Sequence, residues 1–292
     1  MGTRGRLIGG FLLLTLIWGT TWAVIRVGLQ GVPPFTGVAL RFTIAGALLL
    51  ALAAALGVRL GRQRHEKALW VANSLLSFCL SYGIVYWSEQ YIPSGLAAVL
   101  FATNPLFVAA LAHVLLPGER LRPLAGLGML LGFAGVAVIF SDDLSLLGGQ
   151  SVRNAALVML GSPLAAALSS VAVKRWGGGI HPLSLSAIPM LGAGAGMGAV
   201  AFLVERHRPV VFDARSVGAL LYLAILGSAV AFTVYYWLLA RASATRVALM
   251  SYLIPIVAVA VGALAFQEPL RLRLLAGSAL VLAGVVAVSR RR

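Results

Sequence analysis

Polar and aromatic side chains recur at helical spacing inside segments of the chain that are otherwise apolar. In the first of these segments, Thr21 and Trp22 follow Trp18 by three and four residues, which places all three on one helix face. Polar groups are costly in lipid unless they face protein or water, so they indicate a pathway or a binding site. A lining of rings and hydroxyls suits a small amphipathic solute, held by stacking, apolar burial and a few hydrogen bonds.

Four further apolar segments contain side chains of the same kind. The candidate substrate-binding residues are Trp18, Thr21, Trp22, Tyr82, Tyr86, Asn104, Tyr235, Ser251 and Tyr252. A packing role is the alternative, because serine and threonine join membrane helices while tryptophan and tyrosine belong to the interfacial belt. We favour packing for any single serine. Binding is the better interpretation for Trp18, Tyr82, Tyr86, Asn104 and Tyr252.

Two prolines, Pro105 and Pro255, interrupt apolar segments near their middles. Proline removes one backbone hydrogen bond and leaves a carbonyl free. The pair is therefore a candidate set of hinges, and a static kink is an equally good interpretation.

The charged and nucleophilic residues limit the ion coupling, metal binding and catalysis that the sequence can support. All eight acidic residues fall in loops or at helix ends, so no carboxylate is placed at mid-membrane to carry a proton or sodium ion, and Glu89 is the nearest substitute. Arg26 and Arg41 are second-tier candidates for an anion contact or for reaching lipid headgroups. The single cysteine and four scattered histidines offer no metal-ligand spacing, and Ser162 and His113 are too isolated to indicate a nucleophile and its base. We therefore expect no metal, no cofactor and no enzymatic activity.

The composition indicates that lipid surrounds most of the chain. Its 292 residues are 60% hydrophobic and 11% charged, and the mean hydropathy is +0.97. A soluble domain would contain about 25% charged residues. The net charge of +15 lies in short clusters between apolar runs. That pattern is typical of a membrane protein with basic cytoplasmic loops and does not favour nucleic-acid binding.

Ten segments are long and apolar enough to span a membrane as helices, for which about 20 residues are needed. Of the 23 lysines and arginines, 15 fall on the side of the N-terminus, 6 fall on the other side, and Arg26 and Arg41 lie inside helices. Both termini are therefore expected in the cytoplasm. The predicted helices cover residues 7–29, 34–57, 68–88, 94–116, 123–140, 154–175, 182–204, 215–239, 245–266 and 270–289.

The chain also repeats at an offset near 150 residues. Tyr86-Trp87 recurs as Tyr236-Trp237, and Pro105 recurs as Pro255. We therefore predict two five-helix repeats, residues 1–142 and 150–292, within one structural unit. An odd number of helices inverts the second repeat, a plan that lets a transporter open a central site to each side in turn.

With these features the sequence resembles the drug/metabolite transporter superfamily. The resemblance rests on the stretch from Trp18 to Ala23 with Arg26, on the stretch from Pro34 to Arg41, and on the proline pair. Within the superfamily, the sequence is similar to the ten-helix branch that contains bacterial amino-acid exporters of the aromatic-amino-acid type. The resemblance implies a basket-like bundle whose cavity is lined by helices one, three, four, six, eight and nine, with helices five and ten peripheral.

Together, the residues and the resemblance predict an all-α integral protein of the bacterial inner membrane, with ten transmembrane helices in two inverted repeats. The expected function is export of amino acids, neutral or aromatic ones among them, and of related small metabolites by alternating access. A multidrug or other metabolite exporter of the same fold is the alternative. Uniport, exchange and proton antiport stay open as modes of coupling. The expected partners are the solute and membrane lipid, without nucleic acid, and the chain is expected to be a monomer or a weak homo-oligomer.

Overall fold

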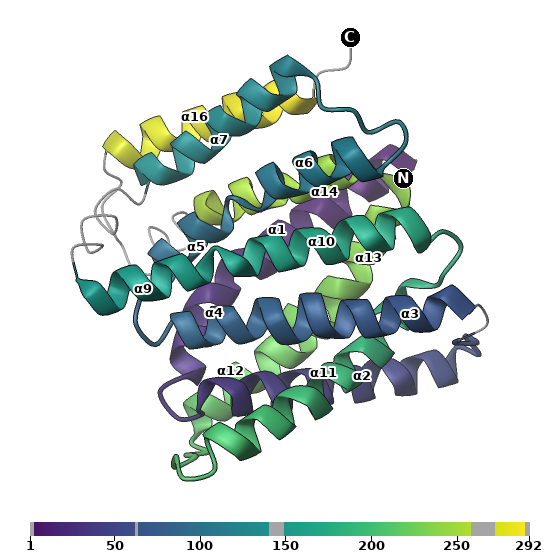
Figure 1. The fold of residues 1–292 in the computed structure, drawn as a ribbon, viewed down its shortest axis with the longest axis vertical. Helices are drawn as coiled ribbons and strands as arrows, with labels where there is room; N and C mark the ends of the chain where they lie inside the picture. The colour runs from purple at the N-terminus through teal and green to yellow at the C-terminus, as the bar shows by residue number, and fades with distance from the viewer. Residues whose placement is uncertain (1–2, 62–63, 140–148, 258–271, 290–292) are drawn as a thin grey trace.

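The computed structural model describes residues 3–61, 64–139, 149–257 and 272–289, and every regular element within these ranges is a helix (Figure 1). The first half contains α1 (Thr3–Gly28), α2 (Pro34–Ala55), α3 (Arg64–Asn73), η1 (Ser74–Ser81), α4 (Tyr82–Ser88), α5 (Ser94–Phe101), α6 (Asn104–Leu115) and α7 (Pro123–Ile139). The second half contains α9 (Gln150–Met159), α10 (Gly161–Trp176), α11 (Pro182–Val204), α12 (Ala214–Ala224), η3 (Ile225–Val230), α13 (Ala231–Arg241), α14 (Ala244–Ala248) and α16 (Leu272–Ser289). A further helical stretch covers residues 250–257.

Seven helices of the described chain are long and apolar enough to cross a membrane, and three shorter apolar helices accompany them. These ten helices overlap the ten segments predicted from the sequence, although the ninth, predicted over 245–266, is described only as far as residue 257. An all-helical chain with membrane-length apolar helices is thereby confirmed. The ten-helix inverted architecture stays a prediction. The shorter helices are Pro123–Val138, Ala244–Val257 and Ala276–Val288.

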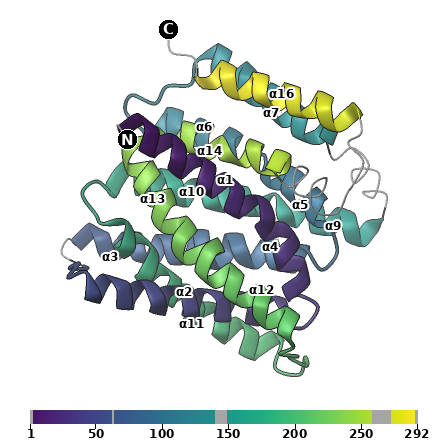
Figure 2. The same cartoon turned by 180° about the vertical axis from the view of Figure 1, so that it is seen from behind.

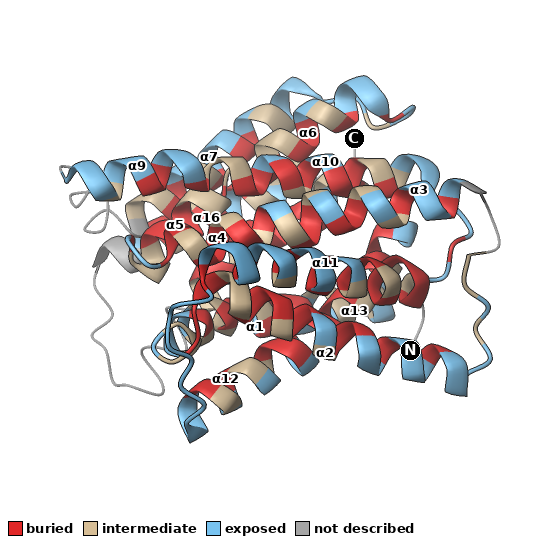
Figure 3. Cartoon of the chain, turned by 60° about the horizontal axis from the view of Figure 1, so that its bottom comes forward, coloured by how far each residue is buried: buried red, intermediate tan, exposed pale blue. Residues whose placement is uncertain are grey.

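Large apolar side chains cover the outside of the bundle. Leu12 and Leu16 of α1 and Phe202 and Leu203 of α11 are each more than half exposed. Figure 3 shows exposed residues along the outward sides of the helices and buried residues where helices meet. A water-facing surface of this kind would be unfavourable, whereas hydrocarbon accommodates it, so the outside of the bundle fits a lipid environment.

Two pairs of helices from opposite halves pack closely and run antiparallel. In the α2–α11 pair, a Cβ placed on Gly46 would lie 2.9 Å from Leu191 N, and one on Gly194 would lie 3.0 Å from Thr43 N. The α7–α16 pair forms an equally extensive contact at one edge of the bundle (Figure 1, Figure 2). Small residues at such crossings let helix backbones approach one another in lipid.

The other contacts between the halves are reciprocal. The first predicted helix, α1, packs on α12 and α13 of the eighth, and the third packs through η1 on α10 of the sixth. The fourth packs through α6 on α14 of the ninth. Reciprocal contacts of this kind are expected of two inverted halves. The division into residues 1–142 and 150–292 stays a prediction, and its boundary at residue 142 lies outside the described residues.

Several long helices are interrupted near their middles. The third and eighth predicted helices contain π-helical turns, η1 and η3, which occur often at functional sites and were not predicted from the hydrophobic pattern. The fourth breaks between Phe101 and Asn104, and the ninth breaks at Leu249. The ring of Pro105 would clash with the carbonyl four residues earlier, which belongs to Phe101, so α5 ends there. The π-helical turns and the breaks thus each occur at equivalent helices of the two halves.

Asn73 shows how polar groups are satisfied inside the bundle. Its Nδ2 donates to Leu185 O at 2.7 Å. Its Oδ1 accepts hydrogen bonds from Ser169 Oγ at 2.6 Å and from Tyr236 OH at 2.8 Å. This one side chain therefore joins the third predicted helix to the sixth, seventh and eighth.

Close glycine packing provides a test of the α7–α16 contact. A Cβ on Gly284 would lie 2.6 Å from Gly132 N, closer than real side chains come. We expect Gly284→Ala to lower the melting temperature of the purified protein in detergent, because overpacking costs about 1–3 kcal/mol. Gly126→Ala is the matched control in α7, with nothing within 4 Å of the added Cβ, and should be neutral or stabilising. Equal melting temperatures for the two variants would contradict the contact.

Candidate functional site

A cavity of about 90 Å³ lies inside the bundle between the two halves of the chain. Its walls come from α1, η1, α4, α5 and α6 in the first half, and from α10, α13, α14 and residues 250–257 in the second. These elements belong to predicted helices one, three, four, six, eight and nine, the set that the family resemblance implies. The described residues of α2, α7, α11 and α16 lie outside the lining.

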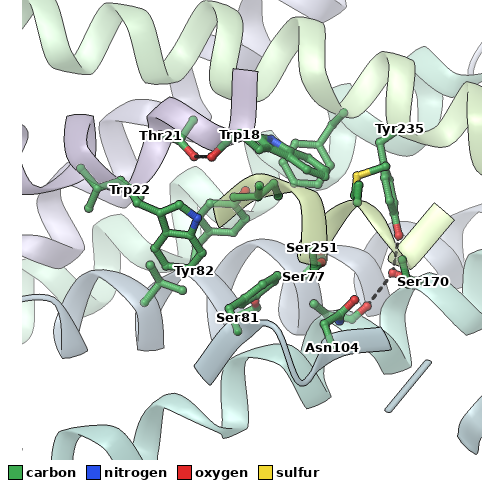
Figure 4. A pocket seen from close by; sticks show the side chains of 18 residues that line it. Trp18, Thr21, Trp22, Ser77, Ser81, Tyr82, Asn104, Ser170, Tyr235 and Ser251 are labelled. Atoms are coloured by element: carbon green, nitrogen blue, oxygen red, sulfur yellow. Dashed lines mark hydrogen bonds between the residues drawn. The ribbon is translucent and has the colours of Figure 1, made fainter. Parts of the chain in front are cut away.

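Most of the predicted binding residues meet at this cavity. Figure 4 shows Trp22 and Tyr82 on one side of it and Ser170 and Tyr235 on the other. The predicted residues that line the cavity are Trp18, Thr21, Trp22, Tyr82, Asn104, Tyr235 and Ser251. Side chains from opposite halves of the chain, far apart in sequence, are thus brought together around one space.

Two predicted residues, Tyr86 and Tyr252, lie outside the lining. Tyr86 is buried, and its hydroxyl accepts a hydrogen bond from Arg41 Nη1 at 3.3 Å. Tyr252 is fully buried, and its hydroxyl donates to Met129 O in α7 at 2.8 Å. Tyr252 directly follows Ser251 in the helix, and this step of one residue turns its side chain away from the cavity that Ser251 faces. The helix register therefore decides which of two adjacent polar residues reaches the solute space.

Some lining residues are not among the predicted binding residues. Ser77 and Ser81 are four residues apart on one face of the third predicted helix, so the periodicity contains a signal for them. Ser170 of α10 has no such context, and its Oγ lies 2.7 Å from Tyr235 OH. The other lining residues are apolar: Ile25, Val85, Phe101, Ala166, Phe232, Ala248, Met250 and Ile254.

Aromatic rings form the apolar part of the wall. Trp18 packs against Phe232 and Tyr235, with ring centroids 5.3 Å and 5.5 Å apart. Trp22 packs edge-to-face against Phe101 at 5.6 Å. Because such contacts stabilise aromatic pairs, each ring holds its neighbour in position. The wall thus presents an ordered apolar surface on which a flat solute can stack.

The polar part of the wall is uncharged. The lining residues that the structure describes include hydroxyls, indoles and one amide, and none carries a charge at neutral pH. Asn104 Nδ2 donates to Pro163 O at 2.9 Å, and Ser81 Oγ lies 2.9 Å from Ser162 Oγ. These bonds hold the polar side chains in place, so the wall is pre-organised for binding.

Arg41 of α2 stands directly behind this wall and is fully buried, with 0% of its surface exposed. Its Nε donates to Ser228 Oγ at 2.7 Å, and its Nη2 donates to Gly227 O at 3.1 Å. The guanidinium lies 4.7 Å from the centre of the Tyr82 ring, a cation–π distance. From sequence, a headgroup contact or an anion contact was expected for this residue. The structure instead uses it to join α2 to η3 and to support Tyr82.

Both candidate hinge prolines adjoin the cavity. Pro105 is in the first turn of α6, next to the lining residue Asn104. Pro255 is buried in the helical stretch 250–257, next to the lining residue Ile254. The two prolines therefore occupy equivalent places in the two halves, and their role as hinges stays a prediction.

Groups that could hold a metal ion do not gather in the part of the chain that the structure describes. No group of three or more His, Cys, Asp or Glu side chains there is placed to hold a metal ion. Ser162 Oγ bonds to Ser81, and His113 Nδ1 accepts a hydrogen bond from Leu121 N at 3.0 Å. These contacts do not pair Ser162 with His113.

Comparisons with known proteins identify the family. The sequence pattern of the EamA-like transporter family matches the chain twice, over residues 6–141 and 153–290. The uncharacterized transporter YvbV of Bacillus subtilis is 27% identical over 287 residues, which are 98% of this chain and 92% of that protein. The uncharacterized inner membrane transporter YedA of Escherichia coli K12 is 32% identical over 260 residues, 88% of this chain and 81% of that protein.

A solved crystal structure shares the fold. Its sequence is 24% identical, and it matches with a TM-score of 0.81 over 99% of this chain and 97% of that chain. The double match of the family pattern covers most of the sequence, and the relatives are named as transporters. The chain therefore belongs to the EamA-like transporter family and is a multi-pass membrane transporter.

Proposed function

We propose that this protein is a secondary transporter that carries small neutral solutes, amino acids with apolar or aromatic side chains among them, by alternating access. One observation carries the proposal: the first, third and fourth helices of each half line the same cavity. A site between two inverted halves can be exposed to either side when the halves exchange conformations. Export is the proposed direction, as the resemblance to bacterial amino-acid exporters implies.

The lining supports a neutral amphipathic solute. Trp18, Trp22 and Tyr82 offer aromatic surface, while Asn104 and Ser251 offer an amide and a hydroxyl. An amino acid at neutral pH carries one ammonium and one carboxylate group, so its net charge suits an uncharged wall. In addition, α6 begins at Asn104, and the N-terminus of a helix favours a carboxylate.

A multidrug or other metabolite exporter of the same fold is the second candidate, because an aromatic wall also attracts organic cations. The cavity volume favours the smaller solute. It is about 90 Å³, whereas pockets for drug-sized ligands are typically about 300–1,000 Å³. We therefore place amino acids first.

Uptake into proteoliposomes separates the two candidates. The purified protein would be tested with a panel of labelled amino acids and with cationic dyes, each with and without a proton gradient. Uptake of neutral amino acids above that of protein-free liposomes supports the proposal. Uptake of dyes without any amino acid would favour the multidrug exporter and overturn it.

Trp22 tests whether the aromatic wall binds the solute. We expect Trp22→Ala to raise the KM for the transported amino acid by about 3- to 10-fold, because an aromatic contact contributes about 0.5–1.5 kcal/mol beyond area burial. Trp87→Ala is the matched control, since Trp87 packs against Tyr91 with ring centroids 5.0 Å apart and lies outside the lining. An equal change in KM for both variants would count against this cavity as the binding site.

The proline pair tests the hinge hypothesis. We expect Pro105→Ala and Pro255→Ala each to slow uptake without reducing membrane insertion, because a restored backbone hydrogen bond stiffens the helix at the cavity. Pro189→Ala is the control, since Pro189 lies inside α11, outside the lining. The hinge hypothesis fails if uptake rates in liposomes match the wild type for both hinge variants.

A further inference from the structure

Glu89 follows the last residue of the membrane span His65–Ser88 and is nonetheless buried, with 4% of its surface exposed. It is the C-cap residue of α4, and its backbone N–H donates to Val85 O at 3.0 Å. Val85, one helical turn before Glu89, lines the cavity. Ile25 also lines it, next to Arg26 in the last turn of α1. Glu89 therefore lies one helical turn beyond the lining at one end of the cavity, which we call the Glu89 end.

Neither carboxylate oxygen of Glu89 has a hydrogen-bond partner. Within the described chain, these two are the buried side-chain nitrogen or oxygen atoms left without one. Other acidic residues differ: Glu205 accepts hydrogen bonds from Phe35 N at 3.0 Å and Thr36 N at 2.8 Å, and Glu119 accepts one from Ala244 N at 3.0 Å. A buried carboxylate without such donors is costly when ionised, whereas its protonated form is not.

The charged groups around Glu89 come from neighbouring helices. Burial raises its pKa well above the ordinary value, and the cations Arg26 of α1 and Arg41 of α2 oppose this rise. Arg26 is exposed, whereas Arg41 is committed to Ser228 and Gly227. Tyr86, one turn earlier on α4, interacts electrostatically with both Arg41 and Glu89.

Other cations nearby are engaged elsewhere. Arg208 Nη1 donates to the side chain of Gln90 at 3.0 Å, and Arg153 of α9 is exposed and donates to Gln150. On α10, Lys174 Nζ donates to Leu239 O at 2.8 Å, at the far end of that helix. Arg26 and Arg41 are thus the cations that act on the Glu89 carboxyl.

Arg41 connects Glu89 to the cavity wall. Gly227 O accepts hydrogen bonds both from Arg41 Nη2 at 3.1 Å and from Trp18 Nε1 at 3.3 Å. The guanidinium also lies over the Tyr82 ring. An ionised Glu89 would compete with these partners for Arg41, so a change of charge at Glu89 would act on two lining residues.

We propose that Glu89 is a proton-binding site that couples the opening of the Glu89 end of the cavity to pH. The carboxyl group holds a proton while this end is closed. When the ends of α1 and α4 separate and water enters, the O–H bond breaks, the proton passes to water, and Arg26 and Arg41 stabilise the carboxylate left behind. Lower pH therefore favours the closed end, and higher pH favours the open one. This inference rests on the proposed transport function and adds proton coupling to it.

Infrared difference spectroscopy tests the proton directly and needs no solute. We expect the wild-type protein in lipid at neutral pH to show the C=O band of a protonated carboxylic acid, and Glu89→Gln to lose it. Asp213→Asn is the control, because Asp213 is exposed and hydrogen bonds from Ser216 lower its pKa, so this variant should keep the band. Absence of the band in the wild type, or its persistence in Glu89→Gln, would overturn the proposal.

Transport assays test the coupling. In proteoliposomes, we expect an imposed pH gradient to change amino-acid uptake by the wild type and Asp213→Asn, but not by Glu89→Gln. Counterflow at equal pH should persist in Glu89→Gln, which shows that this variant is folded, and Glu89→Asp should restore the response. A Glu89→Gln variant that responds as the wild type does would refute the coupling. If the wild type carries no amino acid, the proposed function fails, and the infrared result still decides whether Glu89 holds a proton.

Discussion

Hydrocarbon offers no hydrogen-bond partner, and this constraint shapes the interior of the protein. Buried polar side chains therefore bond to one another across helices, as Arg41 does with Ser228 and Asn73 does with Ser169 and Tyr236. Each of these bonds joins the first half of the chain to the second. The constraint is relaxed at the cavity, where hydroxyls and an amide face open space. Polar side chains that face open space inside the bundle therefore mark the place where a solute can bind.

The helix interruptions follow from the same constraint. Backbone groups freed by a break are tolerated in a membrane protein only beside protein or a cavity. The break before Pro105, the break at Leu249 and the two π-helical turns all lie in helices that line the cavity, and they occur as equivalent pairs. A bundle built this way has its irregular backbone at its centre, while the close pairs α2–α11 and α7–α16 remain regular at the outside.

Helical periodicity was sufficient to predict much of the fold and part of the site. Apolar runs located the helices, and spacing placed Trp18, Thr21 and Trp22 on one face, where the structure has them. Periodicity could not separate Ser251 from Tyr252, because helix rotation depends on packing against α7. Nor could it show that Arg41 is satisfied inside the bundle, because its partners Ser228 and Gly227 lie far away in sequence and in a π-helical turn.

We propose that the cavity between the halves is the path of the solute. Thiol labelling of Ser251→Cys, in a background where Cys79→Ser removes the native thiol, tests it most directly. We expect a membrane-impermeant reagent to modify this cysteine when it is applied from either side of the membrane, and a transported amino acid to slow the reaction from both sides. Reaction from one side alone, without protection by any transported amino acid, would contradict it.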